Sequence, residues 1–154
     1  MDRFSRYIEP LDSSTGLDVI GGKGRSLAAM LRAGLPVPVG FHVTTSAYQQ
    51  FVKYNDIANA ILELATPVIV GARASFETPS TRVTELFERG EIPPDIVDEI
   101  LNAYAALDRD KVAVRSSANA EDLPNLSFAG QQETYLNVHG HDDLLVAVKN
   151  CWAS

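Results

Sequence analysis

The sequence predicts an α+β domain in which a small mixed sheet is flanked by helices. Three short segments alternate apolar and polar residues as strands do, at residues 38–43, 111–116 and 132–138. Between them, apolar residues recur at helical spacing over much of the chain. The 154 residues are 45% hydrophobic and 21% charged, a composition typical of one domain with a buried core.

Charge and cysteine content exclude several classes of protein. The 13 basic and 20 acidic residues give a net charge of −7, which argues against a nucleic-acid partner because such proteins carry basic surfaces. Cys151 is the only cysteine, so an internal disulfide is excluded and a thiolate zinc site lacks ligands. No segment has the roughly 18 successive apolar residues that span a bilayer, and the N-terminus lacks the apolar stretch of a secretory signal. We therefore expect no membrane, no nucleic acid, no metal held by this chain and a cytoplasmic location.

The first motif is Gly21-Gly22-Lys23-Gly24, which predicts a loop ahead of a helix. The helix follows with Leu27, Met30 and Leu31 on one face and ends at Gly34. Closely approaching backbone N–H groups and a lysine suit a phosphate. A plain flexible turn explains the same glycines equally well, and the spacing is not that of a Walker A loop.

The strand at residues 38–43 places His42 on its polar face, where we expect a surface side chain. A helix then runs from Ala47 to Tyr54. The middle of the chain, residues 56–107, predicts further helices from its apolar spacing. Within it, residues 68–70 form either a short strand or the end of a helix.

The strand at residues 111–116 delivers Arg115 and two serine hydroxyls to its C-terminal end. Strand ends that open into loops are common places for ligands, and the planar fork of arginine matches phosphate oxygens. A structural alternative is an ion pair of Arg115 with Glu121 or Asp122 that pins the following loop.

Small residues, two amides and an acid occupy residues 127–134. Backbone N–H groups around Gly130 suit a phosphate, and the Gln131 and Gln132 amides suit polar ligand edges. A β-hairpin turn explains these residues without a ligand.

The last strand, residues 132–138, predicts Thr134, Leu136 and Val138 on one face and Tyr135 on the other. A final helix begins near two aspartates that suit its N-terminus. Its apolar face is made of Leu144, Leu145, Val148 and Trp152.

Taken together, these segments resemble the phosphoenolpyruvate synthase and pyruvate phosphate dikinase family. The resemblance is carried by Gly-Gly-Lys-Gly at 21–24 and Gly-Leu-Pro-Val-Pro-Val-Gly-Phe at 34–41. It continues in Val-Ala-Val-Arg-Ser-Ser-Ala at 112–118 and Ser-Phe-Ala-Gly-Gln-Gln-Glu-Thr-Tyr-Leu-Asn at 127–137. The match is closer to the synthases than to the dikinases, and rifampicin phosphotransferases are a related branch.

The resemblance implies the N-terminal portion of an ATP-grasp-like nucleotide-binding domain. In this family ATP phosphorylates a histidine on a separate domain, which then phosphorylates pyruvate or, in the rifampicin branch, the drug. By the same resemblance, Lys23 and Arg115 match phosphate ligands, while Gly130 and Thr134 match a glycine-rich loop that closes over the nucleotide. No catalytic residue is assigned, and the residues expected to bind ATP are Lys23, Arg115, Gly130, Gln131, Gln132 and Thr134.

Family members are several times longer, so residues 1–154 are expected to be a single, truncated nucleotide-binding domain. The Mg²⁺ ligands and the phosphohistidine domain are then expected on the missing part, which a separate C-terminal chain would carry. The alternatives are a fragment of the rifampicin phosphotransferase type and a non-catalytic remnant or docking module. Because Lys23 and Arg115 are 92 positions apart, ATP binding further predicts that they converge on one phosphate-binding surface.

Overall fold

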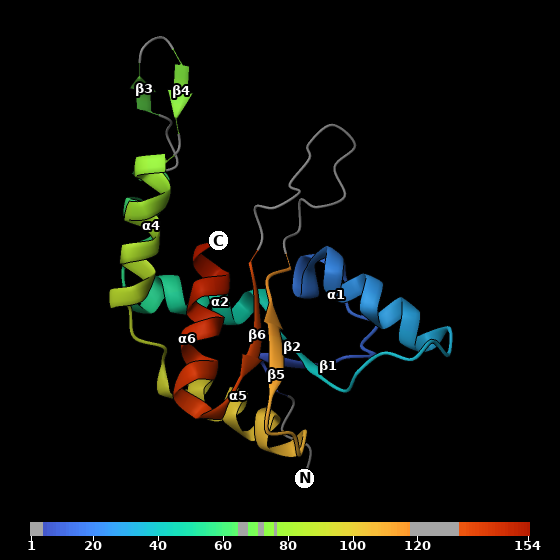
Figure 1. Cartoon of the computed structure of the whole chain (residues 1–154). Helices are drawn as coiled ribbons and strands as arrows, with labels where there is room; N and C mark the ends of the chain where they lie inside the picture. Colours follow the sequence, from blue (N-terminus) through green and yellow to red (C-terminus); the bar gives the residue numbers. More distant parts are fainter. Residues whose placement is uncertain (1–4, 65–67, 71–72, 76, 118–132) are drawn as a thin grey trace.

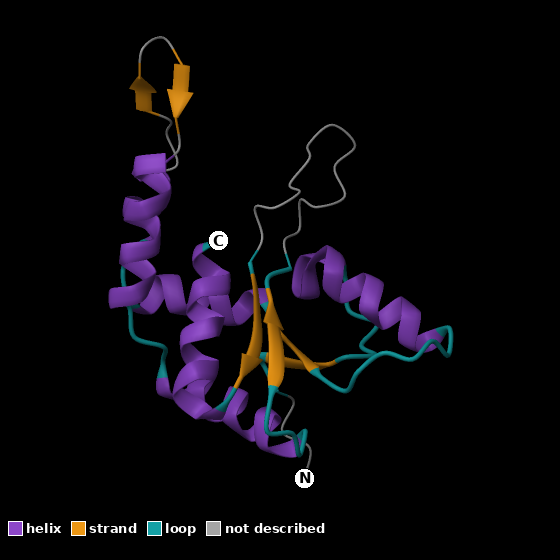
Figure 2. Ribbon diagram, viewed as in Figure 1, coloured by secondary structure: helices purple, strands orange, loops and turns teal. Residues whose placement is uncertain are grey.

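The structure is a computed structural model that describes residues 5–64, 68–70, 73–75, 77–117 and 133–154. These residues form an α+β fold, which confirms the predicted class (Figures 1 and 2). The helices are α1 (Leu17–Arg32), α2 (Thr45–Tyr54), α3 (Ala58–Leu64), α4 (Glu77–Arg89), α5 (Pro94–Ala106) and α6 (Gly140–Ala153). The strands are β1 (Ile8–Pro10), β2 (Phe41–Val43), β3 (Val68–Val70), β4 (Arg73–Ser75), β5 (Val112–Arg115) and β6 (Thr134–Val138).

The described strands pair as three separate antiparallel ribbons, β1–β2, β3–β4 and β5–β6. The prediction of one small mixed sheet is therefore wrong for this part of the chain. Each strand is only three to five residues long. Such short strands satisfy their backbone groups against one neighbour, and antiparallel pairing needs no long crossover between them.

Prolines explain why the first ribbon is shorter than expected. Pro38 has no backbone N–H, and hydrogen-bonded pairing begins only at Phe41. Its partner β1 was not predicted at all, because Ile8-Glu9-Pro10 carries no recognisable alternation and ends in a proline.

A bulge in β6 overturns the predicted assignment of its faces. Val112 pairs with Val138, but Val114 pairs with Tyr135, so β6 has one more residue than β5 over this interval. Asn137 absorbs the extra residue with φ 57°, a left-handed conformation that asparagine tolerates. Tyr135 and Val138 therefore both turn toward the core, while Leu136 is 69% exposed.

The main core lies where α5 and α6 pack against the β1–β2 and β5–β6 ribbons (Figure 1). Its buried members are Tyr7, Ala47, Ile96, Ile100, Tyr104, Val138, Leu144, Ala147 and Val148. Ile96 and Ile100 are one turn apart on α5, which confirms the apolar face that the spacing predicted. This core holds β5 against α6 and so fixes the direction in which the strand ends.

A second core joins α2, α4 and α6. The Phe51 ring stacks on Phe87 with centroids 5.3 Å apart, and Trp152 lies 5.1 Å from Phe51. Aromatic contacts of this kind add about 0.5–1.5 kcal/mol beyond the free energy of burying their surface.

None of the described helices combines the length and apolar character needed to cross a membrane.

Candidate functional site

Helix α1 is interrupted at Gly21, and this break is the first part of the site. Gly21 has φ 69° and ψ 177°, a conformation restricted essentially to glycine, and the helix resumes directly after it. The predicted loop over residues 21–24 is therefore wrong for Gly22–Gly24, which lie within α1. One glycine supplies the whole break, and the others remain helical because glycine in a helix costs only about 1 kcal/mol.

The Ser117 side chain closes this break from the other end of the chain. Its hydroxyl donates a hydrogen bond to the carbonyl oxygen of Ile20 at 2.9 Å and accepts one from the backbone N–H of Gly24 at 3.1 Å. A broken helix leaves such groups without partners, and an unpaired buried group costs about 1–3 kcal/mol. A Cβ atom added to Gly21 would lie 2.3 Å from the Ser117 carbonyl oxygen. The glycine turn and the residues after β5 are therefore in direct contact.

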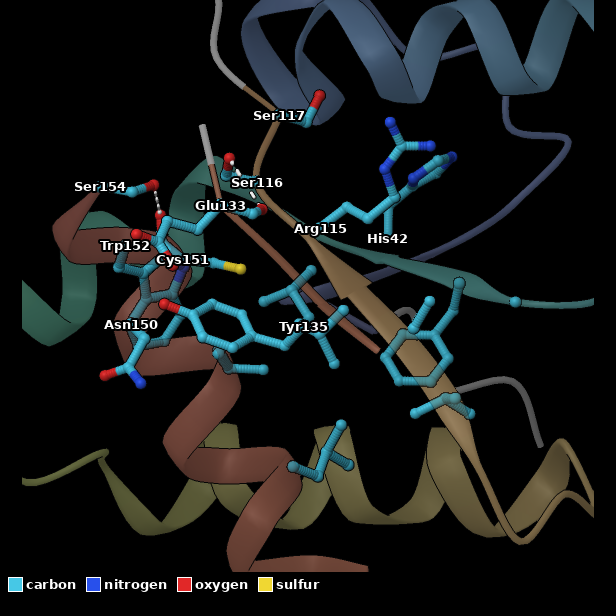
Figure 3. A pocket seen from close by; sticks show the side chains of 18 of the residues that line it. His42, Arg115, Ser116, Ser117, Glu133, Tyr135, Asn150, Cys151, Trp152 and Ser154 are labelled. Carbon is cyan, nitrogen blue, oxygen red and sulfur yellow. Dashed lines mark hydrogen bonds between the residues drawn. The ribbon is translucent and has the colours of Figure 1, made fainter. Parts of the chain in front are cut away.

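Arg115 ends β5 beside this junction. It is exposed and pairs in register with Thr134 of β6, which is also exposed, so the two side chains share one face of the ribbon. The Arg115 side chain points toward His42 and away from Cys151 (Figure 3). Over the described ranges, no carboxylate lies within ion-pair distance of the Arg115 guanidinium.

His42 is buried, which corrects its prediction as a surface residue. It is 9% exposed, and its Nε2 atom lies 3.2 Å from the carbonyl oxygen of Leu11. A Cβ atom added to Gly24 would lie 3.2 Å from His42 Cε1, so the imidazole packs against the glycine turn. Burial lowers the pKa of His42, and the Leu11 carbonyl and the Glu9 charge oppose this effect. The polar face of β2 is covered at His42 because α1 packs there and the Leu11 carbonyl, just after β1, contacts the imidazole.

On the opposite face of the β5–β6 ribbon, Glu133 and Tyr135 form a polar cluster with Asn150 and Cys151 of α6 (Figure 3). Burial raises the pKa of Tyr135 to about 12, and the hydrogen bond and negative charge of Glu133 act in the same direction. Burial also raises the pKa of Cys151 to about 11, with a further increase from Glu133. Both groups are therefore neutral at pH 7.

Lys23 is half-buried in the part of α1 that follows the Gly21 break. Its positive charge lowers the pKa of Cys151 against the effects of burial and Glu133. The structure brings the Lys23 turn and the Arg115 strand end together at Ser117. Because Arg115 extends toward His42, contact of both cations with one phosphate stays a prediction.

A groove of about 1610 Å³ runs past this junction. Its lining includes Ile20, His42, Arg115, Ser117, Glu133 and Cys151. Small-molecule pockets commonly have about 300–1,000 Å³, so the groove has room for a nucleotide. Among the described residues, including those that line the groove, no group of three or more His, Cys, Asp and Glu side chains is placed to hold a metal ion.

The predicted ligand residues have different outcomes. Lys23 and Arg115 lie on elements that meet, and Thr134 shares a face with Arg115. Gly130, Gln131 and Gln132 lie outside the described residues. Sequence reasoning missed the roles of Ser117, His42, Glu133 and Tyr135 in building the site. For Ser117 a signal existed, since two serine hydroxyls follow Arg115, but its partner could be identified only from the fold.

Comparison with known proteins relates this arrangement to one family. Residues 17–154 match the family described as "Pyruvate phosphate dikinase, AMP/ATP-binding domain". The "Probable phosphoenolpyruvate synthase" of Staphylothermus marinus is 40% identical over 159 residues, which cover 97% of this chain and 19% of that protein.

Two further relatives give the same picture. The "Phosphoenolpyruvate synthase" of Aeropyrum pernix is 44% identical over 145 residues, covering 90% of this chain and 18% of that protein. That of Aquifex aeolicus is 41% identical over 166 residues, covering 100% of this chain and 19% of that protein. The chain thus spans less than a fifth of the length of these three relatives. Because the family match takes in the kinked glycine turn, the Arg115 strand end and the groove beside them, the chain belongs to the pyruvate phosphate dikinase AMP/ATP-binding domain family.

Proposed function

We propose that this chain is the ATP-binding portion of a phosphotransferase of the phosphoenolpyruvate synthase kind. The observation that supports it best is the junction at Ser117, where a glycine turn bearing Lys23 meets a strand end bearing Arg115. These segments are more than 90 residues apart and meet at Ser117, beside a groove that Ile20 and Arg115 line. Binding of a polyphosphate by both cations requires such a meeting. The names of the relatives and the matched family agree with this proposal.

The proposed roles follow from charge and geometry. Lys23 supplies a compact positive charge, and Arg115 supplies a planar fork of donors, so both bind the phosphates of ATP. Thr134 lies beside Arg115, and its hydroxyl donates a hydrogen bond to the same phosphates. Gly130, Gln131 and Gln132 belong to the same proposed ligand set.

The proposal places the remaining chemistry outside this chain. When bound with ATP, Mg²⁺ would neutralise charge on the phosphates, and its ligands are proposed to lie on the complementary part of the enzyme. There the phosphoryl group passes to a histidine of a separate domain and then to pyruvate, in the cytoplasm. Within this chain, Lys23 and Arg115 hold the phosphates and stabilise the charge that shifts during transfer.

Calorimetry with ATP and Mg²⁺ on the 154-residue chain tests the proposal. Lys23→Ala and Arg115→Ala are each expected to weaken binding about tenfold or more, because each removes a charge-assisted hydrogen bond. Lys53→Ala and Arg89→Ala, which remove exposed cations from α2 and α4, are the matched controls. Equal losses of ATP affinity in the controls and the site variants would mean that only the overall charge of the chain matters, which contradicts the assigned sites. Absence of ATP binding to the unaltered, folded chain would refute the proposal.

A further inference from the structure

The Ser117 hydroxyl has both of its hydrogen-bonding roles filled by α1. Its proton is donated to Ile20 O at 2.9 Å, and its oxygen accepts the Gly24 N–H at 3.1 Å. These partners lie on either side of the Gly21 break and are 97 and 93 positions away in the sequence. One side chain therefore joins both ends of a broken helix to the segment that follows β5.

The contact between Gly21 and Ser117 is too close to admit a side chain at position 21. The added Cβ at Gly21 would meet the Ser117 backbone oxygen at 2.3 Å and its hydroxyl oxygen at 2.4 Å. Glycine at position 21 lets the two backbones approach, and the serine hydroxyl then fixes their relative position. The α1 segment with Lys23 and the strand end with Arg115 are thus joined at Ser117.

We propose that Ser117 is a positioning residue for nucleotide binding, which sets the separation of Lys23 and Arg115 without itself contacting ATP. This inference rests on the proposed function. The hydroxyl proton is already donated to Ile20 O, so the Ser117 side chain has no donor left for a phosphate. Its effect on ATP binding is therefore indirect and acts through Lys23, the residue before Gly24.

The neighbouring serine provides a matched control. Ser116 Oγ lies 3.5 Å from the carbonyl oxygen of Glu133, at the limit of a hydrogen bond, and among the described residues its hydroxyl makes no hydrogen bond to α1. Ser116→Ala removes the same hydroxyl group one residue earlier. It is expected to leave the α1 junction intact.

A double-mutant cycle on the full 154-residue chain tests the inference, with ATP and Mg²⁺ as the probe in calorimetry. Ser117→Ala is expected to weaken ATP binding at least fivefold, and Ser116→Ala less than twofold. In a Lys23→Ala background, Ser117→Ala is expected to cost less than twofold more, because the residue it positions is gone. Equal losses from Ser117→Ala in both backgrounds would overturn a role through Lys23.

Hydrogen exchange of the Gly24 amide, followed by NMR, reports the junction without ATP. This amide is expected to be protected in the unaltered chain and in Ser116→Ala, and to exchange at least tenfold faster in Ser117→Ala. If that amide loses protection while Ser117→Ala binds ATP as tightly as the unaltered chain, positioning by Ser117 is refuted and the proposed function stands. If the Gly24 amide is protected but the unaltered chain binds no ATP, the proposed function itself has failed.

Discussion

His42 is the buried titratable residue that packs against the glycine turn. Its pKa is lowered in the folded chain, chiefly by burial, so between the lowered value and about 6.5 the unfolded chain binds more protons. The free energy of unfolding is therefore expected to fall as the pH decreases through this window. Urea denaturation between pH 7.5 and pH 5 measures this, and His42→Gln is expected to flatten the dependence.

His139 is exposed and provides the comparison. The His139→Gln chain should keep the pH dependence of the unaltered protein. A His42→Gln chain that lost stability with falling pH as steeply as the His139→Gln chain would show that His42 is not the group responsible.

The reactivity of the Cys151 thiol is sensitive to the charge of Lys23, because that charge lowers its pKa. Burial raises the pKa of this thiol to about 11, Glu133 raises it further and Lys23 opposes them. Alkylation by iodoacetamide at pH 8 is expected to be much slower in the folded chain than in urea, because the thiolate is the reactive form. Lys23→Met is expected to slow it further, whereas Lys53→Met should have no effect. Faster alkylation in Lys23→Met would contradict the placement of the Lys23 charge.

At the scale of the element, Gly21 at the break in α1 and Gly34 after its end are expected to differ in how much stability an alanine substitution costs. Gly21 and Gly34 both have positive φ, but an added Cβ meets Ser117 at 2.3 Å in the first and nothing within 4 Å in the second. Gly34→Ala is expected to cost about 1–2 kcal/mol of unfolding free energy, from backbone strain alone. Gly21→Ala adds a backbone clash to that strain and is expected to cost clearly more. Urea titration of both variants checks this, and equal losses would mean that the close approach at Gly21 is unimportant.

Elements with long periodic patterns could be predicted from the sequence, and short or irregular ones could not. The apolar faces of α5 and α6 follow helical spacing, and the structure confirms them. The faces of β6 were predicted wrongly because a bulge at Asn137 depends on pairing with β5, which no local pattern reveals. His42 was misplaced for a similar reason, since β1 and α1 cover it from distant parts of the chain.

At the scale of the whole molecule, motifs from both ends of the chain predicted one shared site. The Ser117 hydroxyl donates a hydrogen bond to Ile20 O and accepts one from the Gly24 N–H, so the Lys23 segment and the Arg115 strand end are in contact. Convergence of the two cationic side chains on one phosphate stays a prediction. The role of Ser117 in joining them could not be predicted, since a serine after a strand has many possible hydrogen-bond partners.

The central claim is that ATP phosphates bind where the kinked α1 meets the end of β5. A crystal structure of this chain with a non-hydrolysable ATP analogue and Mg²⁺ tests it most directly. The account predicts the phosphates beside Gly22–Gly24 of α1, within hydrogen-bond distance of Lys23 and Arg115. Phosphates bound elsewhere in the groove, for example beside Tyr48 and Trp152, would contradict it.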